Sequence, residues 1–401
     1  MASNGGGAPD KAAQLDALFA AACTPVSPPP STQAAAAHTV VLYHWPCFDG
    51  AGAALAAWLH LAPLARAGGH AHGPRFIPHL VTRALDPAST PGLDTAGPAT
   101  TVYLLDYAGP PGFAAGLAAS AGRVVVLDHH KTAAEEGLPP AAAPGRPPNL
   151  EVHLDRHRSG AGLAAAHFFP GGDDGAAALP PNVARLVAAI EDGDLWKWDR
   201  PDSKAVYAGL GAARVDLDAG GGGGEGEPGG GGVAAVDPAA AVAAADAVFG
   251  RLAGLDIDAL AATGTALLAE QAALVGAAAD GAVPVQLGGP GGAAAGWGRA
   301  LAITVPASLA IHRSALGNEL ASRSAARAGA DPGGRWEPVG VVAYRDPTQA
   351  PGDARIKVSL RSVGPDADTT VVSRHFGGGG HLNASSCMVE EAEYGQWAEL
   401  G

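Results

Sequence analysis

Three runs of apolar residues end in polar residues of ligand type, two of them in aspartate together with histidine and one in a lone aspartate. The ends are HWPCFDG at 44–50, Asp106 after TVYLL, and Asp128-His129-His130 after RVVVL. Convergent carboxylates repel one another unless a positive charge lies between them. Carboxylate and imidazole groups together are a donor set for Mn²⁺, Mg²⁺, Fe or Zn²⁺. The residue types therefore predict a centre for divalent cations, and the number of carboxylates favours two ions that share one of them.

A fourth polar stretch, EDGDLWKWD at 191–199, follows an apolar segment with helical character at 182–190. Asp192 and Asp194 are both placed to close the site. The alternative is ordinary turn chemistry beside Gly193. Trp196 and Trp198 have the ring chemistry to stack a nucleobase, although we expect them to pack at a domain interface.

The apolar runs before these polar residues indicate how they are positioned. Segments 38–44, 101–106 and 123–128 are rich in β-branched and aliphatic residues, and helix-type segments follow at 51–61 and 160–169. Continuous apolar runs suit strands that are buried on both faces, as in a parallel sheet with helices on each side. Ligand sites in such sheets form beyond the carboxyl ends of the strands. We therefore expect the polar residues to converge at one edge of a parallel sheet.

The length and the glycine distribution predict two domains separated by a flexible segment. A chain of 401 residues fits two domains, and the glycine run at 220–232 cannot bury a core. Strand-type segments at 337–345 and 355–362 and a helix-type segment at 314–329 belong to the second domain. The expected boundaries are a disordered leader at 1–36, a catalytic domain at 37–212, a glycine-rich insert at 213–235, a helical linker at 236–282 and a second domain at 283–400.

The net charge of −14 argues against non-specific binding to long duplex DNA, which needs a surplus of Lys and Arg. Three widely spaced cysteines do not form a disulfide framework and favour a reducing compartment, so a cytoplasmic location is expected. An organelle-targeting role for the N-terminal residues is the lesser alternative. We find no strongly apolar run of about 18 residues and expect no membrane span.

The order of these motifs resembles the DHH phosphoesterase superfamily. The matching residues are His44, Asp49 and Gly50, then Asp106, then Asp128-His129-His130, then Asp192. In the second domain KVSLRS at 357–362, FGGGGH at 376–381 and SALGNELA at 314–321 resemble the DHHA1 domain that accompanies many DHH domains. The resemblance covers about residues 38–210 and 284–390. It implies an α/β fold with a doubly wound, mostly parallel sheet, a smaller α+β domain, and an active site in the cleft between them.

The same resemblance implies a metal-dependent phosphoesterase that uses a two-metal hydroxide mechanism. Its substrates would be short single-stranded oligonucleotides or small phosphorylated nucleotides, cleaved at phosphodiester or phosphomonoester bonds, as by an oligoribonuclease, an exonuclease or a phosphoadenosine-phosphate phosphatase. The alternatives are a pyrophosphatase or exopolyphosphatase, and a degenerate protein that only binds a nucleotide. No long duplex DNA and no membrane is expected as a partner, and a homodimer is left open.

Residue roles follow from the resemblance position by position. Asp106 would bridge two Mn²⁺ ions, with Mg²⁺, Co²⁺ or Zn²⁺ as alternatives, Asp128 would orient a histidine, and His130 would face the substrate. The implied metal ligands are His44, Asp49, Asp106, His129 and Asp192. The implied substrate-binding residues are Arg361, Gly378, Gly379, Gly380 and His381.

Some positions leave alternatives open. Many members of the superfamily have an aspartate where this chain has Cys47, which is either a thiolate ligand for a softer metal or, as we expect, a neutral small residue. The glycine run 377–380 is either a flexible insert or, as we expect, a structured loop whose N–H groups approach a phosphate. His153 and His157 have the spacing of a helical metal pair, but we expect no functional role for them.

Overall fold

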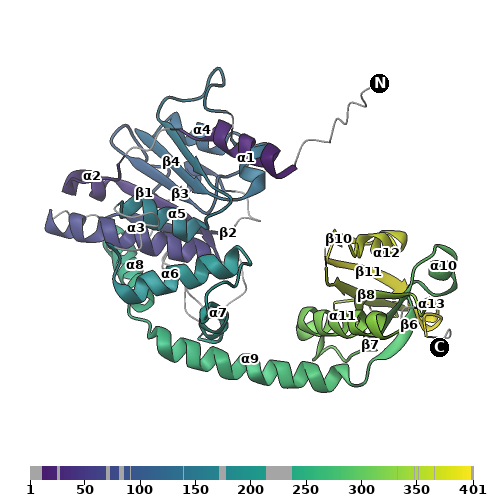
Figure 1. Ribbon diagram of the computed structural model, residues 1–401. Helices are drawn as coiled ribbons and strands as arrows, with labels where there is room; N and C mark the ends of the chain where they lie inside the picture. The colour runs from purple at the N-terminus through teal and green to yellow at the C-terminus, as the bar shows by residue number, and fades with distance from the viewer. Residues whose placement is uncertain are drawn as a thin grey trace, which may run out of the picture. The chain divides into compact units, whose positions relative to one another are not determined.

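The computed structural model describes residues 11–24, 28–68, 73–80, 85–90, 92–138, 140–170, 178–213, 237–331, 333–346, 348–350, 352–364 and 366–398. The chain divides into two compact units, residues 1–265 and 266–401 (Figure 1). The expected glycine-rich insert falls almost entirely at 214–236, outside the described residues.

The first unit is built on a five-stranded sheet in which every strand pair is parallel. The strands in spatial order are β2 (Arg75–Leu80), β1 (Thr39–Trp45), β3 (Thr101–Leu105), β4 (Arg123–Asp128) and β5 (Leu150–Leu154). The chain leaves β1 toward β2 on one side and resumes at β3 on the other, so the strand order reverses between β1 and β3. The predicted doubly wound parallel sheet is confirmed, and this reversal point is where such sheets bind ligands.

Alternate residues of each strand enter different cores, which explains the continuous apolar runs. In β3, Tyr103 and Leu105 pack into one core, whereas Val102 and Leu104 pack into the other. Helices therefore cover both faces (Figure 1). One face holds α2 (Gln33–Ala37), α3 (Phe48–Ala67), α5 (Gly160–Phe168), α6 (Pro181–Asp194), α7 (Ser203–Ala212) and α8 (Pro238–Ala253); the other holds α1 (Lys11–Ala22) and α4 (Phe113–Ala118).

The expected disordered leader is wrong for much of its length. Helix α1 buries Phe19 in the core beneath β4 and β5. The Thr24 hydroxyl accepts a hydrogen bond from the Val152 amide at 2.9 Å, and the Thr24 amide donates to the Val152 carbonyl at 2.9 Å. This segment therefore occupies the free edge of β5, where unpaired backbone groups would otherwise be exposed.

The expected helical linker at 236–282 is also wrong in part. Helix α8 packs on the core of the first unit, where the fully buried Phe249 lies edge-on to Tyr43 at 6.1 Å between ring centroids. Only α9 (Ile257–Ala279) runs from the first unit into the second. By length and composition α9 is apolar enough to cross a membrane, contrary to our expectation, although Asp258 and Glu270 interrupt its apolar surface.

Two edge strands were missed from the sequence, and both carry histidines. β2 contains Pro78, a residue confined to sheet edges, and buries His79, whose ring lies 4.8 Å from that of Tyr107. His79 therefore packs inside the first unit and is not a solvated loop residue. His153 lies in β5 and His157 in the turn after it, so they are not a helical pair.

The second unit is a mixed six-stranded sheet with the α+β character predicted for it. In spatial order the strands are β10 (Gly379–His381), β11 (Ala384–Glu390), β9 (Arg355–Ser362), β8 (Trp336–Tyr344), β7 (Arg299–Thr304) and β6 (Val283–Gln286). Helix α11 (Arg313–Ala330) packs on one face, and a core around Trp397 covers the other. Shorter helices are α10 (Gly289–Ala294), α12 (Thr370–His375) and α13 (Glu391–Gly395).

Candidate metal centre

Polar side chains from three adjacent strands meet at the carboxyl edge of the first sheet. His44 is the penultimate residue of β1, Asp106 directly follows β3, and His129 and His130 follow β4. These strands are neighbours in the order β1-β3-β4, and β1 and β3 flank the point at which the strand order reverses. The predicted convergence of these residues is present.

Asp106 lies between the other polar groups and contacts them through both oxygens. Its Oδ2 is 3.0 Å from His44 Nδ1, and its Oδ1 is 3.1 Å from His129 Nε2 and 3.5 Å from His130 Nδ1. The Asp106 backbone has φ of +55°, a left-handed conformation that is uncommon for a residue other than glycine and is typical of functional sites. This placement is the one that a bridging carboxylate requires.

Asp49, in the first turn of α3, is buried and connects that helix to α5. Its carboxylate accepts hydrogen bonds from the amides of Gly160 at 2.6 Å and Ala161 at 2.9 Å, at the beginning of α5. Asp49 Oδ2 also lies 3.5 Å from His129 Nε2. A Cβ at position 160 would lie 2.6 Å from the Asp106 Cβ, so only glycine allows α5 to begin this close to the site.

The third aspartate of the cluster is Asp194, not Asp192 as the resemblance implies. Asp194 Oδ2 lies 3.4 Å from His129 Nε2, and Asp49, His129 and Asp194 have donor atoms within 4.8 Å of one another. Helix α6 continues through Asp194. Residues two apart on a helix point about 200° apart, so Asp192 and Asp194 cannot both face the cluster.

A sequence signal for Asp194 was available. Val183, Val187 and Ile190 are buried, and Asp194 continues that same stripe at the spacing i, i+4, i+7, i+11. We expected the helix to end at residue 190, which left positions 192 and 194 without an assigned face. Asp194 is the ligand candidate that this error concealed.

Asp192 instead organises the chain after α6. Its carboxylate accepts hydrogen bonds from the amides of Asp199 at 3.0 Å and Arg200 at 3.1 Å, and its carbonyl accepts one from Lys197 at 2.9 Å. The residues enclosed by these bonds include Trp196 and Trp198, both with φ of +55°. Asp192 therefore stabilises a loop with two strained tryptophans.

Without a cation, the cluster shows strong electrostatic conflict. Burial raises the pKa of the Asp49 carboxyl to about 8, and the negative charges of Asp106 and Asp194 act in the same direction. Burial also raises the pKa of Asp194. The hydrogen bond with Asp106 raises the pKa of His44 to about 10, with a smaller contribution from Cys47. Protons thus relieve a repulsion that bound cations would relieve in their place.

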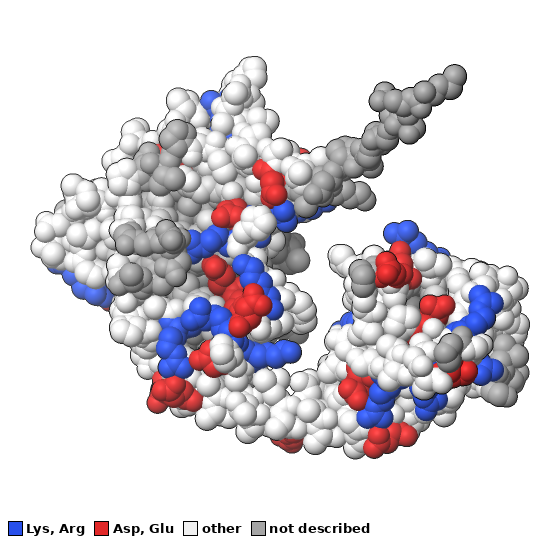
Figure 2. Space-filling model, in the orientation of Figure 1, with Lys and Arg blue, Asp and Glu red and all other residues white. Residues whose placement is uncertain are grey.

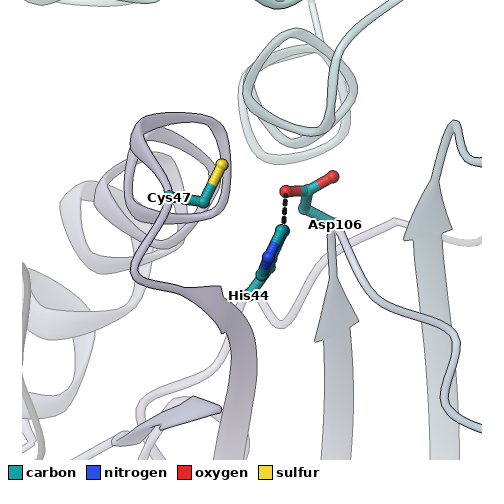
Figure 3. A group of neighbouring side chains, drawn as sticks. All are labelled: His44, Cys47 and Asp106. Atoms are coloured by element: carbon teal, nitrogen blue, oxygen red, sulfur yellow. Dashed lines mark hydrogen bonds and ion pairs between the residues drawn. The ribbon is translucent and has the colours of Figure 1, made fainter. Parts of the chain in front are cut away.

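Two buried atoms of the cluster point to the same conclusion. Asp106 Oδ1 and His129 Nε2 are inaccessible to solvent, and although they lie 3.1 Å apart, neither makes a hydrogen bond of good geometry with the other or with another described residue. Two further groups of donors lie within 4.8 Å of one another: Asp106, His129 and His130, and also His44, Cys47 and Asp106 (Figure 3). The donor set, its burial and its unpartnered atoms fit divalent cations, and Asp106 belongs to two of the three groups.

Asp128 and His130 form a hydrogen-bonded pair beside the cluster. Asp128 Oδ1 accepts hydrogen bonds from the His129 amide at 2.7 Å and the His130 amide at 3.0 Å, and lies 2.8 Å from His130 Nδ1. The His130 side chain is 45% exposed, compared with 12% for His129. His129 thus faces the cluster and His130 is the more exposed of the two, while the expected contact of His130 with a substrate stays a prediction.

The expected substrate-binding residues of the second unit lie on or beside β9 and β10, the two strands that flank β11. Arg361 of β9 and His381 of β10 are both paired with Ala384 of β11, so their Cα atoms are about 10 Å apart in one row. The Arg361 guanidinium donates to the Ser314 hydroxyl at 2.8 Å, while His381 is exposed. Gly380 has φ of +144°, and a Cβ there would lie 2.4 Å from the Ala384 carbonyl oxygen. The glycine run is therefore a structured hairpin, as expected.

No family model and no curated protein matches the chain significantly. Its structure is similar to three solved structures. A pGpG-specific phosphodiesterase from Vibrio cholerae has 12% identity, covers 90% of this chain and 95% of its own, and gives a TM-score of 0.40. An exopolyphosphatase-related protein from Bacteroides fragilis has 15% identity, coverages of 90% and 91%, and a TM-score of 0.34. RecJ from Thermus thermophilus, in complex with Mn²⁺, has 16% identity, coverages of 97% and 61%, and a TM-score of 0.36.

At these identities and TM-scores the similarities do not by themselves assign a function. The assignment of a metal centre follows from the residues of this chain. The predicted histidines and aspartates, with Asp194 in place of Asp192, lie at the reversal point of a doubly wound parallel sheet.

Proposed function

We propose that the protein is a metal-dependent phosphoesterase that hydrolyses phosphodiester or phosphomonoester bonds of short nucleotides. The observation that carries this proposal is the cluster around Asp106, in which three histidines and three aspartates converge at the carboxyl edge of the sheet. A structural role does not explain buried, unpartnered ligand atoms beside mutually repelling carboxylates.

The cluster offers ligands for two ions that share Asp106. One group would be His44 and Asp106 with Cys47 beside them. The other would be Asp49, His129 and Asp194, with Asp106 Oδ1 reaching it at 3.1 Å from His129 Nε2. When bound, divalent cations such as Mn²⁺ would supply hydroxide near neutral pH and would neutralise negative charge on the phosphate. Asp49 would hold its position through its bonds to the α5 amides.

His130 is suited to exchange a proton with the substrate. The hydrogen bond with Asp128 raises its pKa, so His130 is protonated more readily than an isolated histidine. Because Asp128 contacts Nδ1, the Nε2 atom is the one available to donate a proton to a departing oxygen. Asp128 is then a positioning residue that fixes the orientation of this ring.

Two features support a nucleotide as the substrate. Trp196, two residues after Asp194, is 76% exposed and rests edge-on against Trp198 at 5.3 Å between ring centroids. Its Cα is within about 7 Å of the Asp194 Cα, so its ring can accept a stacked base near the metal cluster. In the second unit, Arg361, His381 and the amides of Gly378, Gly379 and Gly380 are proposed to bind phosphate or base.

The surface charge supports a short substrate over long duplex DNA. Figure 2 shows Lys and Arg side chains mixed with Asp and Glu over the α6 and α7 side of the first unit, rather than a continuous basic surface. Arg185 of α6, for example, is paired with both Asp202 and Asp258. Binding to a long polyanion would require basic side chains that are available to its phosphates.

Metal-free protein supplied with Mn²⁺ and a labelled dinucleotide tests the proposal. We expect mononucleotide release that depends on the metal and falls by at least about 1000-fold, or 4 kcal/mol in activation free energy, in Asp106→Ala and His129→Ala. His157→Ala is the matched control, because that exposed histidine lies outside the cluster. Hydrolysis of pyrophosphate but of no nucleotide would favour the anhydride-cleaving alternative, and nucleotide binding without hydrolysis would favour the degenerate one.

A further inference from the structure

Cys47 stands among metal ligands, in a position that the other two cysteines do not share. Its Sγ, a ring nitrogen of His44 and a carboxylate oxygen of Asp106 lie within 4.8 Å of one another. In Figure 3 the Cys47 side chain points from the start of α3 toward the space beside His44 and Asp106. Cys23 contacts the backbone of Leu154, and Cys387 is buried in the core of the second unit, where burial raises its pKa to about 12.

Helix capping does not explain the position of Cys47. It is the N-cap residue of α3, yet its side chain makes no capping hydrogen bond. A serine, threonine, aspartate or asparagine would stabilise the helix start by about 1 kcal/mol more at this position. The Cys47 Sγ instead lies within 4.8 Å of a ring nitrogen of His44 and of a carboxylate oxygen of Asp106. The interactions of Cys47 are therefore with the cluster and not with the helix.

We propose that Cys47 is a thiolate ligand, and that it makes the His44–Cys47–Asp106 group selective for a softer cation such as Zn²⁺ over Mg²⁺ or Mn²⁺. Thiolate favours zinc, whereas carboxylate-rich sites suit magnesium and manganese. The group of Asp49, His129 and Asp194 contains no sulfur and would keep a preference for harder cations such as Mg²⁺ or Mn²⁺. The thiol proton would pass to solvent as the metal binds. This inference rests on the proposed function only in requiring that the cluster binds metal.

We thus favour the thiolate alternative over the neutral small residue that we expected from the sequence. An inert residue at this position would not need a donor atom directed at two other ligands. A thiolate at position 47 would also give the two ions different affinities, because one site would contain sulfur and the other only oxygen and nitrogen donors. Titration with Zn²⁺ should therefore fill the two sites at separate concentrations.

Cobalt substitution tests the thiolate directly, independently of hydrolysis. Metal-free wild-type protein, Cys47→Ser, Cys47→Asp and the control Cys23→Ser are titrated with Co²⁺, and the near-ultraviolet thiolate-to-cobalt charge-transfer absorption is recorded with metal stoichiometry. We expect the band in the wild type and Cys23→Ser, and its loss in both Cys47 variants. We also expect Zn²⁺ affinity to fall by at least about tenfold in Cys47→Ser, and Cys47→Asp to regain Mn²⁺ affinity at that site.

The outcomes separate this inference from the proposed function. Two bound Co²⁺ ions without a charge-transfer band, or a band that persists in Cys47→Ser, would overturn the thiolate ligand and leave the phosphoesterase proposal standing. Wild-type protein that binds no Co²⁺ would overturn both. Far-ultraviolet circular dichroism of the variants verifies that they are folded.

Discussion

Asp106 joins the two halves of the cluster, because each of its oxygens contacts a different histidine. Burial acts to raise the pKa of this carboxyl, but its close contacts with His129 and His44 outweigh burial and lower the pKa to about 2. The contact with Asp106 helps to raise the pKa of His129 to about 9, against the effect of its own burial. The residue that is central in position is thus also the carboxylate that remains ionised.

Mutation of Asp194 should affect metal binding, whereas mutation of Asp192 should affect stability. We expect Asp194→Asn to lose one bound Mn²⁺ and to slow hydrolysis at least about 100-fold, or 2.7 kcal/mol, because a ligand is removed. Asp192→Asn should keep both ions but destabilise the first unit by about 1.5–3 kcal/mol, through its hydrogen bonds to the amides of Asp199 and Arg200. Metal analysis and chemical denaturation measure the two effects. Loss of metal from Asp192→Asn, with Asp194→Asn unchanged, would restore the original assignment.

At the scale of elements, the loop after α6 combines strain with exposure. Trp198 packs against Tyr207, whose ring lies 5.5 Å from that of Phe48 at the start of α3. Trp196 lies at the exposed end of this aromatic series. Contact with Trp198 therefore holds the Trp196 ring in place, and this gives Trp196 the rigidity that a stacking surface needs.

Trp196→Ala should weaken the binding of nucleotides but not of pyrophosphate. Loss of base stacking is worth about 1–3 kcal/mol, so we expect KM for a dinucleotide to rise roughly 5- to 150-fold with little change in kcat. Trp196→Phe keeps an aromatic ring and should recover most of the affinity. Steady-state kinetics on both substrates check the effect, and an equal loss on pyrophosphate would point to damage to the metal site instead.

The sequence predicted the central elements better than the peripheral ones. β4 and β9 have the expected bounds because β4 is a continuous apolar run and β9 alternates regularly between apolar and polar residues. β2 and β5 are edge strands in which one face is less buried, and Pro78 interrupts the strand pattern of β2. The course of α1 could not be predicted, because its weak apolar pattern gains its partner only from the folded edge of β5.

At the scale of the whole molecule, a buried histidine outside the cluster limits the stability of the fold at low pH. His167 of α5 is buried with its Nε2 atom 3.1 Å from the Tyr103 hydroxyl. Burial lowers the pKa of His167 to about 3, and the positive charges of His153, Arg123 and His60 act in the same direction. In the unfolded chain His167 would bind a proton near pH 6.5, whereas in the folded chain its pKa is about 3.

Acidification should therefore destabilise the first unit through His167. The contribution of this residue is complete above pH 6.5 and is lost as the pH falls from 6.5 toward 3, by up to about 1.4 kcal/mol per pH unit. His167→Gln keeps a hydrogen-bonding group without a proton to bind in this range, so its stability should depend less on pH. Hydrogen exchange of the α5 amides at pH 7, 6 and 5 measures the difference. Identical pH profiles for the two proteins would contradict this account.

Cys47 and Asp49, two residues apart in the stretch HWPCFDG at 44–50, have different roles. Asp49 is bound to the amides that begin α5 and cannot change without disturbing the fold, whereas the Cys47 side chain caps nothing. If Cys47 binds metal as we propose, a substitution at position 47 should alter metal preference while the architecture stays intact. This makes position 47 the natural starting point for engineering versions of the protein with different metal requirements.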